Sequence, residues 1–346
     1  MGQVPLVLKN GGGDEDRSHD CFPGWIMTPY GRVNLPFTGI ASFCKFPIHT
    51  DLDTLCADVA VFGIPWDEGI GYRPGARFGP RSIREYSTRF AFHERAVKEA
   101  GYWSIEDKKR YLDGIRVADC GDQDILYLNV EETFSAITAS VEKLLSAKAF
   151  PVILGGDHSI TFPVVRAFRK FSPLRLIHLD AHLDYNDSIE GVLLANGNPI
   201  KRISELDFVG EIVQIGMRGI RAREDACKDS FSRGNTIIPM ADLRRKGVHE
   251  ILSLIPQGGN AYVTLDVDVL DPSIAPGTSS PDFDGMTHGE IKALLAGIAS
   301  RASVVGFDLV EVNPFLDPIG LTQSLVVTII LEFLGAIFDR KGAERY

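Results

Sequence analysis

Short apolar runs alternate with amphipathic helical patterns from about residue 57 onward, and this alternation limits the possible folds more than any other feature of the sequence. The runs read ADVAVFGIP, IRVADCGD, FPVILGG, LRLIHLDAH, EIVQIGM, NTIIPM, AYVTLDVD and SVVGFDLVEV. Segment 131–149 shows the helical partner, because Phe134, Ile137 and Val141 fall on one face of a helix. Parallel strands need crossover connections, which are usually helices. The sequence therefore predicts an α/β fold with a parallel sheet.

The chain of 346 residues shows no internal repeat and no abrupt change of composition after residue 57, so we expect one domain over 57–346. Residues 1–56 are expected to form a partly flexible N-terminal arm, because residues 11–20 are polar and Gly-rich. The apolar segment 324–338 is short for a bilayer span and carries Glu332, which favours a buried core helix. No signal peptide is evident at the start.

Net charge and cysteine usage exclude several classes of protein. The formal net charge is -10 and the pI is about 5.3, whereas nucleic-acid binding relies on clustered Lys and Arg. The five cysteines are scattered and lack CxxC spacing, so we expect neither a disulfide framework nor a zinc ribbon. We therefore expect a cytoplasmic protein in a reducing environment, with no nucleic-acid or membrane partner.

Three of the predicted strands end in acidic and imidazole side chains. These side chains are Asp157 and His158 after the first of them, Asp180, His182 and Asp184 after the second, and Asp266 and Asp268 after the third. Each set alone fits a cap, a turn or a solvated strand face. The carboxyl ends of parallel strands lie at one edge of the sheet, where functional sites form. If these groups converge there, their unpaired negative charge would destabilise the fold unless cations compensate it.

Two divalent ions would balance the four aspartates Asp180, Asp184, Asp266 and Asp268, and a carboxylate can bridge two ions. Carboxylate with imidazole suits Mn, Co, Ni or Zn, and the absence of thiolates argues against a structural zinc site. The residues alone thus favour a metal centre at the edge of the sheet.

Five segments in order carry a resemblance to a known family. GGDHS, DAHLD, DVDVLDPSIAPGT, YRPGARFGPRSIR and DLVEVNP resemble the ureohydrolases, the family of arginase and agmatinase, and the similarity runs from about 57 to 338. The resemblance implies a three-layer α/β/α sandwich with an eight-stranded parallel sheet. It also implies oligomers of three or six subunits and hydrolysis of a guanidino or amidino C–N bond.

Carried over motif by motif, the resemblance implies two ions per chain, nickel or manganese. The first ion would be held by His158, Asp180, Asp184 and Asp266, and the second by Asp180, His182, Asp266 and Asp268. Glu311 matches the acid that binds the guanidinium group, and bidentate recognition of a planar cation suits a carboxylate. Asp268 is the expected group for passing on the proton of the attacking water.

The chain departs from the family pattern at Asn196, which stands where many relatives carry a proton-shuttling His. Asn cannot titrate, so that shuttle is absent or replaced. Loop 185–196 contains acidic residues but no Lys or Arg, which suits a cationic or uncharged substrate tail unless Arg73 or Arg77 enters from another loop. The N-terminal run 25–43 and segment 66–80 resemble the guanidine hydrolase branch of the family.

These departures lead to the hypothesis that the substrate is a small N-alkylated guanidine or biguanide, with metformin the specific candidate, cleaved to dimethylamine and guanylurea. Guanidine, agmatine and guanidinobutyrate hydrolysis, which yield urea, are the alternatives. Two further alternatives are a mononuclear site like that of the related deacetylases, and a scaffold subunit in a homo- or hetero-hexamer with a related chain. Substrate contacts are expected from Asn196, position 185 (Tyr185), Trp66 and Tyr72.

Overall fold

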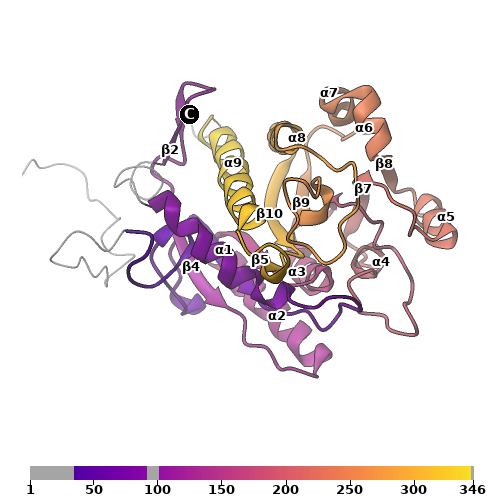
Figure 1. Ribbon diagram of the computed structural model, residues 1–346, viewed down its shortest axis with the longest axis horizontal. Helices are drawn as coiled ribbons and strands as arrows, with labels where there is room; N and C mark the ends of the chain where they lie inside the picture. The colour runs from indigo at the N-terminus through magenta and orange to yellow at the C-terminus, as the bar shows by residue number, and fades with distance from the viewer. Residues whose placement is uncertain (1–34, 92–100, 344–346) are drawn as a thin grey trace, which may run out of the picture.

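Eight parallel strands form the central sheet of the computed structural model, which describes residues 35–91 and 101–343 (Figure 1). The strands are β1 (Val59–Ile64), β4 (Val117–Asp122), β5 (Phe150–Gly155), β6 (Leu174–Leu179), β7 (Val209–Met217), β8 (Thr236–Pro239), β9 (Asn260–Asp266) and β10 (Ser303–Val310). Their order across the sheet is β4-β1-β5-β10-β9-β6-β7-β8, and every pairing is parallel. Each predicted apolar run is a strand of this sheet, which confirms the predicted fold class.

Helices cover both faces of the sheet. One layer contains α1 (Gly79–Ser87), α6 (Met240–Lys246), α7 (Val248–Ser253), α8 (His288–Arg301) and α9 (Leu321–Ala343). The other contains α2 (Val130–Ser146), α3 (Thr161–Arg166), α4 (Pro199–Ser204) and α5 (Glu224–Ser232). The predicted apolar face of α2 is buried against the sheet at Phe134, Ile137 and Val141. Apolar burial on the two faces makes the main contribution to the stability of the three-layer sandwich.

Helix α9 confirms the expectation for the apolar segment 324–338. By length and composition its window Leu321–Asp339 could cross a membrane, but 67% of that window is buried inside the fold. Glu332 pairs with His288 of α8 at 2.8 Å between carboxylate and imidazole. The helix packs across the sheet next to α1 and α8, as Figure 1 shows.

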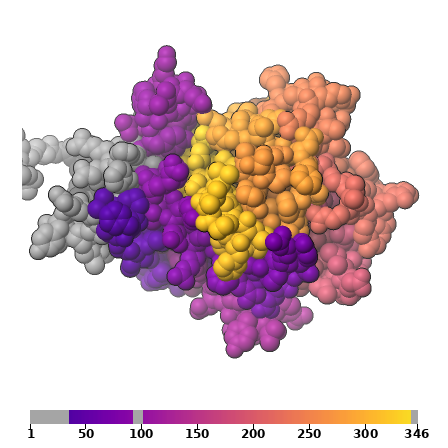
Figure 2. Space-filling model, in the orientation of Figure 1, coloured from indigo at the N-terminus to yellow at the C-terminus, as the bar shows by residue number. Residues whose placement is uncertain are grey.

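A short antiparallel hairpin stands outside the main sheet and was not predicted from the sequence. It pairs β2 (Tyr102–Ser104) with β3 (Lys109–Tyr111) and projects from the body of the molecule in Figure 2. Lys109 forms an ion pair with Asp339 of α9 at 2.8 Å. The hairpin lacks an apolar run, so no alternation of apolar and polar residues marked it.

Within the predicted N-terminal arm, residues 42–46 are packed against the domain. Phe43 is fully buried, and its backbone N–H donates to Asp119 Oδ2 at 2.7 Å. Arg84 of α1 forms an ion pair with the same carboxylate at 2.8 Å and with Asp122 at 2.6 Å. A boundary at residue 56 remains a prediction, and the Gly-rich segment 11–20 lies outside the described residues.

Three cysteines are free thiols, as expected: Cys44, Cys120 and Cys227. Cys56 is disulfide-bonded, which departs from the expectation of a fully reduced set. Its position, three residues before β1, lies in a segment where the scattered spacing of the cysteines gave no pairing signal.

Candidate metal centre

The predicted metal ligands all follow strands that are neighbours in the middle of the sheet. His158 follows β5, Asp180 follows β6, and Asp266 ends β9, while β10 lies between β5 and β9 and leads to Glu311. Because these strands are parallel, their carboxyl ends meet at one edge. The structure therefore brings together residues that are up to 153 positions apart, as the pair His158 and Glu311 illustrates.

The turn after β5 is built to present His158. A Cβ on Gly156 would come within 1.7 Å of the Trp66 carbonyl oxygen, so a side chain at this position would clash with backbone. Asp157 caps the following short helix by accepting from the Ser159 N–H at 2.9 Å. His158 Nε2 lies 2.9 Å from Thr264 Oγ1, so its other ring nitrogen, Nδ1, is turned toward the carboxylates.

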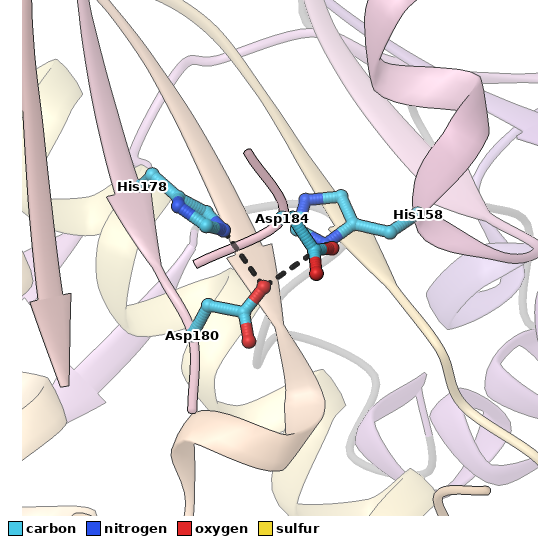
Figure 3. A group of neighbouring side chains, drawn as sticks. All are labelled: His158, His178, Asp180 and Asp184. Carbon is cyan, nitrogen blue, oxygen red and sulfur yellow. Dashed lines mark hydrogen bonds and ion pairs between the residues drawn. The ribbon is translucent and has the colours of Figure 1, made fainter. Parts of the chain in front are cut away.

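Three carboxylate oxygens surround the imidazole nitrogen Nδ1 of His158. Asp180 Oδ2 and Asp184 Oδ2 are each 3.1 Å away, and Asp266 Oδ2 is 3.4 Å away. Figure 3 shows Asp180 and Asp184 converging on the ring. Asp184 adopts a left-handed backbone conformation with φ of 46°, which is uncommon for a residue other than Gly and typical of functional sites. These four side chains could hold one metal ion.

A second cluster lies beside the first and shares Asp180 with it. His182 Nδ1 is 3.0 Å from Asp268 Oδ2 and 3.4 Å from Asp180 Oδ1. Asp180 thus turns one oxygen toward His158 and the other toward His182, as a carboxylate does when it bridges two ions. Asp180, His182 and Asp268 could hold a second ion.

The buried carboxylates and imidazoles of the two clusters shift one another's pKa values. Burial, and then the charges of Asp268 and Asp180, raise the pKa of Asp266 well above its ordinary value. Burial alone would lower the pKa of His182, but Asp268 and Asp180 raise it to about 12. Bound cations would offset the negative charge of such a cluster of carboxylates.

One further observation indicates that these donors suit metal ions. His158 Nδ1 is fully buried and has no hydrogen-bond partner among the described residues, although three carboxylates face it. An unpartnered buried nitrogen of this kind is costly unless a ligand occupies it. Aspartate oxygens with imidazole nitrogens are suitable ligands for Mn, Ni or Zn.

Glu311 lies next to the two clusters, immediately after β10, with φ of 66° and an exposure of 4%. Its Oε1 accepts from the His158 N–H at 3.0 Å and from Asn196 Nδ2 at 3.1 Å. Its Oε2 lies 3.4 Å from Ser279 Oγ. Burial, and then the charge of Asp157, raise the pKa of Glu311 to about 8. The carboxylate is held by three donors with one oxygen left largely open.

A pocket of about 790 Å³ leads to this edge of the sheet. Asn196 and Glu311 line it together with the metal-ligand candidates Asp184, His182, Asp266 and Asp268. Tyr72 also lines it and is 65% exposed, and its contact with a substrate stays a prediction.

Two predicted substrate contacts are corrected by the structure. Trp66 is 2% exposed and packs edge-on against Phe134 with ring centroids 5.9 Å apart, so it is a core residue. Tyr185 is 1% exposed and donates its hydroxyl to Ser204 at 2.8 Å. The next residue, Asn186, lines the pocket instead. Both predictions rested on the loop in which the residue lies, and this does not give the direction of its side chain.

Basic side chains do enter the pocket, from a loop that sequence reasoning overlooked. Arg218, Arg221 and Arg223 follow β7 and line the mouth of the pocket, whereas Arg77 is taken by an ion pair with Asp67. Arg223 pairs with Asp225 at 2.6 Å, and Arg221 pairs with Asp282 at 3.2 Å. The MRGIRAR run after a predicted strand was the signal for this loop.

Two further residues were missed at the metal clusters. His178 Nε2 lies 2.7 Å from Asp180 Oδ2, and Asp282 Oδ2 lies 2.8 Å from His182 Nε2. His178 alternates with Asp180 and His182 in HLDAHLD, so the same spacing could have identified it. Asp282 comes from a loop, and no spacing marked it.

Comparisons with known proteins agree with this geometry. The model of the Arginase family matches residues 57–335. A human mitochondrial guanidino acid hydrolase is 33% identical over 330 residues, covering 94% of this chain and 88% of that protein. Guanidinopropionase from Pseudomonas aeruginosa is 34% identical over 315 residues, covering 88% and 94%.

A solved structure gives the same result for the fold. Proclavaminate amidino hydrolase from Streptomyces clavuligerus superposes with a TM-score of 0.78 at 31% identity, covering 88% of this chain and 98% of that one. The region matched by the family model, residues 57–335, includes every strand of the sheet that carries the clusters. The chain belongs to the arginase family and is an amidinohydrolase that cleaves C–N bonds of guanidino compounds.

Proposed function

We propose that this protein hydrolyses a small guanidino compound at a dinuclear metal centre, with metformin as the specific candidate substrate. The observation that supports this most is the pair of His/Asp clusters that share Asp180 beside the carboxylate of Glu311. A single cluster would suit the mononuclear alternative, but two adjoining clusters favour two ions. The completeness of both clusters also favours a catalytic chain over a scaffold subunit.

In this proposal each ion has four protein ligands. The first is held by His158, Asp180, Asp184 and Asp266, and the second by Asp180, His182, Asp266 and Asp268. When bound, two such ions supply Lewis acidity and lower the pKa of water toward neutrality. Nickel or manganese suits the mixed donor set.

The chain's own residues would position the substrate and move protons. Glu311 would pair with the guanidinium group through Oε2, because Oε1 is already occupied by the His158 N–H and by Asn196. Asp268 would accept the proton of the attacking water, since its Oδ1 is fixed by the Ala181 N–H at 3.0 Å while Oδ2 faces the second cluster. Asn196 would hold Glu311 in place and could not itself shuttle a proton.

Metformin is proposed because of the character of the pocket away from the metal clusters. Apolar side chains such as Tyr72, Ile189 and Val192 line its mouth, and they could accommodate N-methyl groups. Arg223 is already paired with Asp225 and Arg221 with Asp282, which reduces the attraction of these two arginines for a substrate carboxylate. Cleavage would release dimethylamine and leave guanylurea.

A guanidino acid is the second candidate, and Arg221 and Arg223 are the observation that favours it. Both line the pocket, and Arg221 has a side-chain exposure of 52%. The names of two relatives, a guanidino acid hydrolase and a guanidinopropionase, point the same way. Guanidinobutyrate is one member of this class, and guanidine and agmatine are the remaining alternatives.

A substrate screen on metal-loaded enzyme separates these candidates. Purified protein is loaded with Ni²⁺ or Mn²⁺ and offered metformin, guanidine, agmatine, guanidinopropionate, guanidinobutyrate and arginine, with the released amine or urea as the readout. A higher kcat/KM for metformin is the expected result. Clear preference for agmatine or arginine would contradict it, and preference for a guanidino acid that disappears in Arg223→Ala would establish the second candidate.

We further propose a cytoplasmic homo- or hetero-hexamer with a related subunit, with nickel or manganese bound in the cell. The resemblance to oligomeric ureohydrolases supports the assembly, and the mixed oxygen and nitrogen donor set supports the metals. Mass determination by light scattering, on the chain expressed alone and with a companion, tests the assembly. Metal analysis of the same preparations identifies the ion and distinguishes two per chain from one.

A further inference from the structure

A buried chain of hydrogen bonds runs from α5 to the carboxylate shared by the two clusters. Ser230 Oγ donates to Gln214 Oε1 at 3.1 Å, Gln214 Nε2 lies 3.0 Å from His178 Nδ1, and His178 Nε2 lies 2.7 Å from Asp180 Oδ2. All four side chains are fully buried. Figure 3 shows the last of these contacts, with His178 and His158 approaching the same oxygen of Asp180.

The backbone fixes the orientation of Gln214. Gln214 Nε2 lies 2.7 Å from the carbonyl oxygen of Leu183, and a carbonyl can only accept a hydrogen bond. This atom must therefore be the amide nitrogen, and the other amide atom, which accepts from Ser230, must be the oxygen. Gln214 and His178 are also register partners on the neighbouring strands β7 and β6, so their side chains lie on one face.

The orientation of Gln214 in turn fixes the tautomer of His178. Because the amide nitrogen donates to Nδ1, that ring nitrogen must carry the lone pair, and the proton of the neutral ring must be on Nε2. Nε2 then donates to Asp180 Oδ2. The oxygen that receives this bond is the one that faces His158, while Oδ1 faces His182.

We infer that His178, with its tautomer set by Gln214, is a positioning residue that orients Asp180 as the bridge between the two metal ions. This inference rests on the proposed dinuclear function and adds to it a residue outside the ligand set. A ligand carboxylate with two rotatable bonds needs such a partner, and loss of an outer hydrogen bond of this kind commonly weakens metal binding by about 10- to 100-fold. The effect should fall mainly on the ion on the His158 side.

The test uses the full chain, stripped of metal and titrated with Mn²⁺ while electron paramagnetic resonance records free, mononuclear and spin-coupled ions. His178→Phe keeps a ring but removes the donor, and His178→Gln restores an N–H near the place of Nε2. We expect about 10- to 100-fold weaker binding and a mononuclear signal in place of the coupled one for His178→Phe, with recovery in His178→Gln. A purely structural role would lower the melting temperature of the metal-free protein and leave the coupled signal intact.

His288→Phe is the matched control, because His288 Nε2 also pairs with a carboxylate, Glu332, at 2.8 Å but on α8 far along the chain from the clusters. It should bind Mn²⁺ as the unmodified chain does. If His178→Phe does not fold, Gln214→Met tests the same series of hydrogen bonds. A loss of the coupled signal smaller than that expected for His178→Phe is then the expected result. A coupled signal of normal affinity in either variant overturns the inference, whereas normal Mn²⁺ binding by Asp266→Ala would overturn the proposed dinuclear centre itself.

Discussion

Replacing Glu311 with glutamine should separate substrate binding from metal binding. The two side chains have nearly the same shape, and the amide oxygen of glutamine can still accept from the His158 N–H and from Asn196, as Oε1 does now. The change removes Oε2, which has a single, long contact of 3.4 Å to Ser279 and is thus open to the guanidinium group. The local fold should therefore survive.

The size of the effect follows from that one lost acceptor. A hydrogen bond to a charged group contributes about 1.5–3 kcal/mol, and burial of Glu311 at 4% exposure places this bond near the upper end. A loss of about 3 kcal/mol corresponds to a decrease in kcat/KM of about 100-fold. Because Glu311 is not among the proposed ligands, the metal content should stay at the value of the unmodified enzyme.

Initial rates of amine release over a range of substrate concentrations give kcat/KM. Metal analysis of the same sample gives the metal content. Glu190→Gln is the control, because Glu190 lines the same pocket but is exposed at its mouth, and it should change kcat/KM by less than about threefold. An unchanged kcat/KM in Glu311→Gln would refute the role of this carboxylate. A loss of metal would show instead that Glu311 supports the clusters.

The structure makes three further predictions. Because burial and Asp157 raise the pKa of Glu311 to about 8, and only the ionised acid can pair with a guanidinium, kcat/KM should rise from pH 6.5 to above pH 8, with this dependence absent in Glu311→Gln. Asp266→Ala should lose both metal and turnover, since Asp266 is assigned to both ions; metal analysis and rates check this, and an active variant would contradict the assignment. Arg84→Met should lower the free energy of unfolding by about 3–5 kcal/mol in urea titrations, because it leaves Asp119 buried without its partner, and a loss below about 1 kcal/mol would show that Phe43 N–H and water suffice.

The fold could be predicted from sequence because the decisive signals are local. Each strand of the sheet is an apolar run bounded by polar residues, and the apolar face of α2 repeats with a helical period. The order of strands is not local information, and the resemblance to a family supplied it. The β2–β3 hairpin was not predicted, because its strands contain no apolar run. Its Tyr102 and Tyr111 rings stack on each other with centroids 5.4 Å apart, and this contact has no local sequence pattern.

The metal clusters were predictable for a similar reason, since strand ends concentrate at one edge of a parallel sheet. The residues that line the walls of the pocket could not be predicted in this way. Trp66 follows β1 and Tyr185 follows β6 at the edge of the sheet that carries the clusters, yet both side chains are buried in the core. Arg221 and Asp282 come from separate loops, and their approach to His182 depends on how two loops fold over the sheet, which no spacing in the sequence records.

The position of β9 and β10 in the middle of the sheet has a consequence for how the enzyme is made. During synthesis β5 and β6 leave the ribosome well before β9 and β10, yet in the finished sheet the two late strands separate the two early ones. Glu311 is thus synthesised 153 residues after His158, which is more than a third of the chain. Because β10 lies between β5 and β9, the ligand candidates on those two strands can take their final spacing only after β10 is inserted, and we expect metal to bind in its final geometry only then.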